Sequence, residues 1–175
     1  LLPVAVGICL YFSLRLPFSI GGFFIKLYTL WAPYHFSGQA LGVSLLYARR
    51  AGVHLSPWER RVLSYFIFSS FFFMVARGES MSWTQHFVGL SYSSLGLPSW
   101  IATLFAIWFF LCSFCFGIVF FKARQWDRLP LIFFLPAFSQ LVWFIGGPNF
   151  PGFYQLVPFF HSLQYLPIVW LLFLV

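Results

Sequence analysis

Long, uninterrupted apolar runs constrain this chain more than any other feature of its sequence. Hydrophobic residues make up 61% of the chain and charged residues only 7%, whereas about a quarter of the residues in an ordinary soluble domain are charged. So few charges cannot cover a surface that faces water, so we expect residues 1–175 to form a single integral membrane domain. The runs do not alternate with a period of two, which favours helices over a β-barrel.

A helix that crosses the hydrocarbon core of a bilayer needs about 20 mostly apolar residues. The apolar runs therefore predict an all-α, polytopic transmembrane bundle of about six spans, several of them kinked by proline. We expect these spans near residues 2–16, 19–47, 57–76, 98–121, 129–146 and 151–174. The first run is short and the last ends without polar residues, so we expect the chain to be trimmed at both ends.

The segment 79–97 is too polar to be a span. It mixes Ser, Gln and His with apolar residues, and the spacing of Trp83, Phe87 and Leu90 predicts a short amphipathic helix in the outer membrane interface. A re-entrant lid over a site is the alternative interpretation of this segment.

Basic residues cluster in two short loops that a six-span topology places on the same side of the membrane. That side is expected to be cytoplasmic, in the inner (plasma) membrane of a bacterium. The formal net charge of +7 therefore indicates topology, and no basic stripe suited to nucleic acid is present. One loop supplies four residues that anchor this face and are candidates to bind anionic lipid headgroups: Arg49, Arg50, Arg60 and Arg61.

Local signals mark the ends of the helices around this loop. Ser56-Pro57-Trp58-Glu59 is a capping box with proline at the first helical position. Gly52 follows two arginines and predicts the end of the preceding helix.

Two histidines in apolar segments, His35 and His161, are the best candidates for an intramembrane site. Each has a glutamine one helical turn later and a tyrosine beside it or one turn away. Tyr28, Trp31, His35, Gln39 and Gly42 share one helical face, and we expect that face to lie in the bundle interior, where the second, fifth and sixth spans converge. The predicted ligand-binding residues are Tyr34, His35, Gln39, Gln140, His161, Gln164 and Tyr165.

The chemistry of this predicted site remains open at the level of sequence. Neutral imidazole is a good ligand for transition metals and haem iron, so His35 and His161 are candidate metal or haem ligands. The abundance of aromatic residues also suits a pigment, quinone or lipid. In the simplest alternative, each histidine forms one interhelical hydrogen bond. Lys26 either extends to the lipid headgroups or points inward as a cation that holds an anionic group.

The functional hypothesis is therefore a multi-pass membrane protein that binds a hydrophobic ligand or cofactor at this His/Gln/Tyr site. One alternative is a non-catalytic scaffold or accessory subunit of a larger membrane complex. Another is a membrane enzyme that uses a histidine as general base on a lipid substrate. Membrane lipids are the expected partners, together with other membrane subunits. No catalytic residue can be assigned, and whether the chain is an enzyme is left open.

Overall fold

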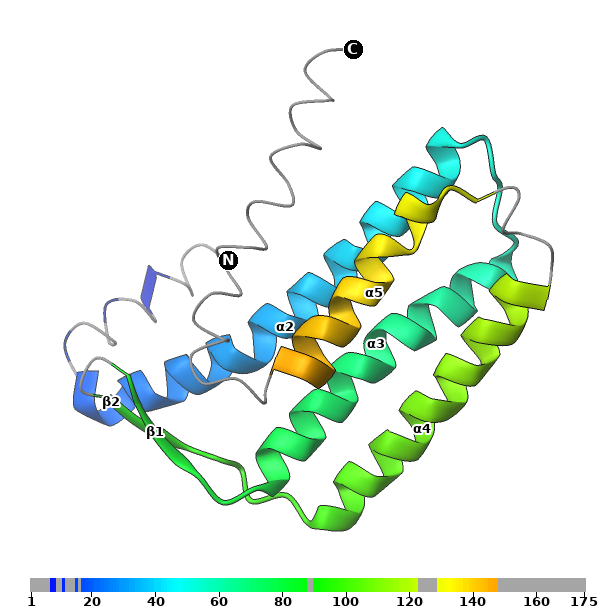
Figure 1. Ribbon diagram of the computed structural model, residues 1–175. Coiled ribbons are helices and arrows are strands. Elements are labelled where there is room, and N and C mark those ends of the chain that lie inside the picture. Colours follow the sequence, from blue (N-terminus) through cyan, green and yellow to red (C-terminus); the bar gives the residue numbers. More distant parts are fainter. Residues whose placement is uncertain are drawn as a thin grey trace.

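The computed structural model describes residues 7–8, 11, 15, 17–87, 90–122 and 129–147. This part of the chain forms four α-helices and one β-hairpin (Figure 1). In chain order the elements are α2 (Pro17–Arg50), α3 (Pro57–Ser80), β1 (Thr84–Phe87), β2 (Leu90–Ser93), α4 (Ser99–Gly117), the π-helical turn η1 (Ile118–Lys122), the 3-10 turn η3 (Leu131–Phe133), α5 (Leu135–Leu141) and the π-helical turn η4 (Val142–Gly146). The predicted span 151–174 and most of the span 2–16 lie outside the described residues.

Among the described residues, two helices are long and apolar enough to cross a membrane, judged by length and composition. They run over Pro57–Ser80 and Ser99–Phe121, while Leu135–Gly146 is apolar but shorter. These helices match the spans expected near 57–76 and 98–121. The helical character of the fold is therefore confirmed.

Helices α3 and α4 pack side by side along most of their length (Figure 1), and the core lies where they meet η1, η3, α5 and the end of α2. Aromatic side chains fill it: the rings of Phe66 and Phe116 stack at 4.4 Å with an interplanar angle of 12°. Phe120 and Phe133 are fully buried, and their ring centroids lie 5.6 Å apart. Offset and edge-to-face pairs of this kind are favourable beyond the area they bury, so the phenylalanines hold these helices together.

Helix α2 packs on α3 and α5 through small side chains. Its buried positions include Ala32, Ser37, Ser44 and Ala48. Small residues let helix backbones approach closely. Pro33 lies inside the helix without ending it, and its carbonyl oxygen accepts a hydrogen bond of 2.9 Å from Ser37 Oγ.

The prediction of an amphipathic helix within 79–97 is wrong, because this segment contains the antiparallel hairpin β1–β2. Thr84 pairs with Ser93 and Phe87 with Leu90, and Ser94 N–H extends the pairing by donating to Trp83 O at 3.0 Å. The sequence of β2, Leu-Ser-Tyr-Ser, alternates apolar and polar residues with the period of a strand. The residues of the predicted helical spacing belong to different elements: Trp83 precedes β1, Phe87 ends β1 and Leu90 begins β2.

Candidate functional site

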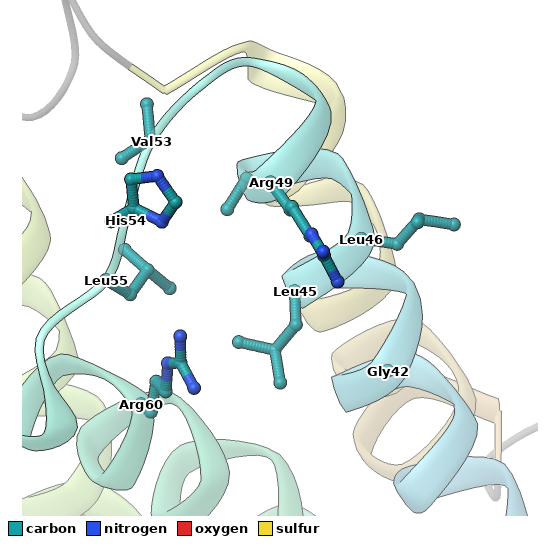
Figure 2. A pocket seen from close by; sticks show the side chains of 9 residues that line it. Gly42, Leu45, Leu46, Arg49, Val53, His54, Leu55 and Arg60 are labelled. Carbon is teal, nitrogen blue, oxygen red and sulfur yellow. The ribbon is translucent and has the colours of Figure 1, made fainter.

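A pocket of about 510 Å³ lies at the corner where α2 ends and α3 begins (Figure 2). We call it the arginine pocket. Its lining residues are Gly42, Leu45, Leu46, Ala48, Arg49, Val53, His54, Leu55 and Arg60. They come from the last turns of α2, the connecting loop and the first turn of α3, so the corner itself builds the pocket.

Local sequence signals fix the α2 side of this corner. Gly52 has a φ of 72°, which is the left-handed conformation that glycine adopts without steric cost. Gly52 N–H donates to Arg49 O at 3.1 Å and Val53 N–H to Ala48 O at 2.9 Å. This is a Schellman motif. It satisfies two of the carbonyl groups at the negative end of the helix.

The α3 side begins with the predicted capping box, which is confirmed. Glu59 N–H donates to Ser56 Oγ at 3.3 Å, and Ser56 N–H donates to Glu59 Oε2 at 2.6 Å. The Glu59 carboxylate is thereby held against the helix start and is not among the groups that line the pocket. The next residue, Arg60, lines it instead.

The charge of the arginine pocket is one-sided. Arg49 and Arg60 supply two permanent positive charges, and Figure 2 shows their guanidinium groups and the His54 imidazole around the same opening. None of the described lining residues is acidic. Leucine and valine side chains form the rest of the wall. A space with cations at one part and aliphatic side chains at another suits an amphiphile with an anionic head.

The structure divides the four arginines predicted to bind headgroups into two pairs. Arg49 and Arg60 line the arginine pocket together, whereas their neighbours Arg50 and Arg61 are not among its lining residues, although all four side chains are exposed. Sequence reasoning missed His54. Its place between the two arginine pairs in the same short loop was the available signal.

The predicted intramembrane residues on α2 lie on a more open face than expected. His35 is exposed, and its ring stacks on Trp31 at 4.9 Å with an angle of 14°. Tyr34 is 51% exposed and contacts the rings of Phe68 and Phe71. Within the described part of the chain, the small-residue face of α2 packs inward and the His35 face is exposed. The span expected to cover His35 lies outside the described residues, so the interior placement of this face stays a prediction.

Gln140 differs from these residues because it is only 4% exposed. Its Nε2 is buried without a hydrogen-bond partner within the described structure. Helix α5 packs on α2, as expected for the second and fifth spans. The two helices run in opposite directions (Figure 1), and Phe36 meets Trp143 at 6.4 Å. One turn away from that contact on each helix are Gln39 and Gln140, which therefore lie at similar depth.

The other half of the predicted site, His161, Gln164 and Tyr165, lies outside the described residues. The pairing of His35 with His161 therefore stays a prediction. Over the ranges that the structure describes, no group of three or more His, Cys, Asp or Glu side chains could hold a metal ion.

A second polar cluster joins α2 and α3 to the hairpin at the opposite end of α2. Both carboxylate oxygens of Glu79 accept hydrogen bonds from Lys26 Nζ, and the two side chains are only 8% and 12% exposed. Lys26 Nζ also lies 4.6 Å from the centroid of the Trp83 ring. The prediction that Lys26 extends to the lipid headgroups is therefore wrong. The lysine points inward, and the anionic group that it holds is a side chain of the same chain.

No protein-family model, curated protein or solved structure matches this chain. The functional argument therefore rests on the chemistry of the residues described above.

Proposed function

We propose that this chain is a multi-pass integral membrane protein whose arginine pocket lies at the cytoplasmic face and binds the headgroup of an anionic lipid. The membrane assignment is supported by the two long apolar helices and by the side chains on the outside of α4. Large apolar residues on that surface are more than half exposed: Trp100, Leu104, Ile107, Phe110, Leu111 and Phe114. A contiguous apolar surface of this kind favours aggregation in water, whereas lipid chains can cover it.

The observation that carries the binding proposal is the convergence of Arg49, His54 and Arg60 on one pocket with aliphatic walls. Guanidinium groups bind phosphate oxygens through paired, charge-assisted hydrogen bonds. The aliphatic residues Leu45 and Leu55 offer a surface for the start of an acyl chain. Arginines at a cytoplasmic helix end also lie at the depth where anionic headgroups are found.

Two double variants test this proposal because each removes the same charge from the same short loop. Arg49→Gln/Arg60→Gln removes the two guanidinium groups that line the pocket, and Arg50→Gln/Arg61→Gln removes their neighbours, which do not line it. The full chain, in neutral detergent micelles, is titrated with a fluorescent short-chain phosphatidylglycerol. Two hydrogen bonds to the phosphate, of about 1 kcal/mol each, would be lost, so the pocket variant should bind about 30-fold more weakly.

Arg50 and Arg61 provide the matched control, because they carry the same charge and are exposed like Arg49 and Arg60 but do not line the pocket. Without a hydrogen bond to the headgroup, their screened charges should change affinity by less than about threefold. Equal losses in the two variants would show that general positive charge, and not the pocket, attracts the lipid. Unchanged binding in both would refute the proposal outright.

The buried Nε2 of Gln140, which has no hydrogen-bond partner among the described residues, supports a second candidate function. An unpaired polar group in an apolar interior costs about 1–3 kcal/mol, and a carbonyl or ether oxygen of a bound hydrophobic ligand would offset that cost. Together with His35, Gln39 and the His161 region, this amide would form the predicted intramembrane site for a lipid, quinone, pigment or haem.

This second candidate has a direct test on the purified chain. A visible absorption spectrum, metal analysis and extraction of bound lipids would detect the ligand, and His35→Ala, Gln140→Leu and His161→Ala should each reduce it. If all three variants retain the same spectrum, metal content and lipids as the parent, the intramembrane site does not exist. Stable co-purifying subunits in that case would favour the scaffold alternative.

A further inference from the structure

We infer that the arginine pocket selects a phosphate monoester headgroup carried on an apolar chain. This inference rests on the proposed function and narrows it from anionic lipids in general to one chemical class. The reasons are the sign of the charges in the pocket, the number of its donors and the apolar wall.

Charge disfavours the zwitterionic headgroups first. A choline or ethanolamine phosphodiester carries a cation next to its phosphate, so its net charge is zero and guanidinium groups attract it less than an anionic headgroup. The described lining residues include Arg49 and Arg60 but no acidic side chain. The ammonium group of such a lipid would therefore gain no carboxylate partner among these lining residues.

The number of donors favours a monoester over an anionic diester. A diester offers two terminal oxygens and a single charge, whereas a monoester offers three terminal oxygens and a charge of about −1.5 to −2 at pH 7. Three donor groups from three segments of the chain surround the pocket: Arg49 from α2, His54 from the loop and Arg60 from α3 (Figure 2). Donors that approach from separate directions can engage a third oxygen, which a diester lacks.

The apolar wall distinguishes a lipid from free phosphate. Leu45, Leu46, Val53 and Leu55 line the same pocket as the cations. Inorganic phosphate would leave these side chains in contact with water, whereas a lipid chain would cover them. The same phosphate chemistry could come from either source, and competition between the two separates them.

The test uses the full chain in phosphatidylcholine nanodiscs doped with equal amounts of phosphatidic acid or phosphatidylglycerol, with bound lipid quantified by native mass spectrometry. One additional charge-assisted hydrogen bond corresponds to about tenfold in affinity, so phosphatidic acid should bind about tenfold more tightly than phosphatidylglycerol. Phosphatidylcholine should not be retained. His54→Leu should remove most of the preference for phosphatidic acid, while Arg50→Gln/Arg61→Gln, which alters neighbours that do not line the pocket, should preserve it.

The possible results separate the two proposals. Equal binding of phosphatidic acid and phosphatidylglycerol would overturn the monoester inference and leave the anionic-lipid function standing. No preference for either over phosphatidylcholine would overturn both. Displacement of phosphatidic acid by an equal concentration of inorganic phosphate would show that the free anion is the ligand and would overturn the lipid assignment.

Discussion

Breaking the ion pair between Lys26 and Glu79 should destabilise the fold by more than any surface charge would. The pair links α2 to the last turn of α3, and Glu79 Oε2 also accepts the Leu95 N–H at 2.7 Å. Leu97 N–H donates to the Glu79 carbonyl oxygen at 2.9 Å. The segment that follows the hairpin is thus tied to both the carboxylate and the backbone carbonyl of Glu79, whose side chain is only 8% exposed.

The two single variants should differ because each leaves a different group behind. Removing one partner of a buried ion pair costs roughly 3–5 kcal/mol. Lys26→Met leaves the Glu79 carboxylate with the Leu95 N–H among its described partners, so we expect a loss near the lower limit, about 3 kcal/mol. Glu79→Gln leaves Lys26 above the Trp83 ring, whose attraction for the cation offsets about 1 kcal/mol of the loss, so about 2 kcal/mol is expected.

The double variant Lys26→Met/Glu79→Gln contains no buried charge at this place and should lose only about 2 kcal/mol, which gives a coupling energy of about 3 kcal/mol. The measurement is the free energy of unfolding of the full chain in detergent micelles, followed by circular dichroism against denaturant. Losses in the single variants that simply add in the double variant would mean that the two side chains do not interact. That result would refute the reasoning.

Three further predictions concern packing and pH. Gly22→Ala should destabilise by about 1–3 kcal/mol, measured by thermal melting, because its Cβ would lie 2.5 Å from a hairpin carbonyl oxygen; Gly38→Ala, with nothing within 4 Å, should not. Phe120→Ala should cost about 3–5 kcal/mol in denaturant unfolding, whereas Phe110→Ala, at a site that is 66% exposed, should cost much less. Burial raises the pKa of the Tyr92 phenol above 10.0. The folded state therefore holds this proton more tightly than the unfolded state, so stability should be unaffected by this group below pH 10 and fall above it. Tyr92→Phe should remove that fall in an alkaline titration.

Local chemistry made several parts of the structure predictable. The capping box at Ser56 and the stop at Gly52 are interactions between residues at most five positions apart, so the sequence alone shows both partners. The same holds for the lengths of α3 and α4, which follow from apolar runs of the right extent. Four arginines in one short loop likewise indicated a basic corner.

The orientation of α2 could not be predicted from its polar residues. In the proposed membrane setting, burying an apolar side chain against another helix gains little over lipid contact, since lipid tails are as apolar as leucine. Hydrophobicity therefore does not distinguish the interior of a membrane bundle from its surface. The small side chains Ala32, Ser37, Ser44 and Ala48 decide which face packs, and His35 is left on the more open side.

The partner of Lys26 could not be predicted from the sequence either. Glu79 lies 53 residues away, and the hairpin that completes their surroundings was mistaken for a helix. In the same way, Arg49 and Arg50 are equivalent in sequence, and only the geometry of the corner sends one into the pocket and leaves the other outside.

By itself, the sequence determined the apolar helices, their starts and stops, and the positive charge of one loop, because these depend on neighbours within a turn or two of backbone. Tertiary structure decided which face of α2 packs, which arginines share a pocket and which carboxylate receives Lys26. Those outcomes depend on segments that are distant in the chain, and a bond between them exists only after the backbone has brought them together.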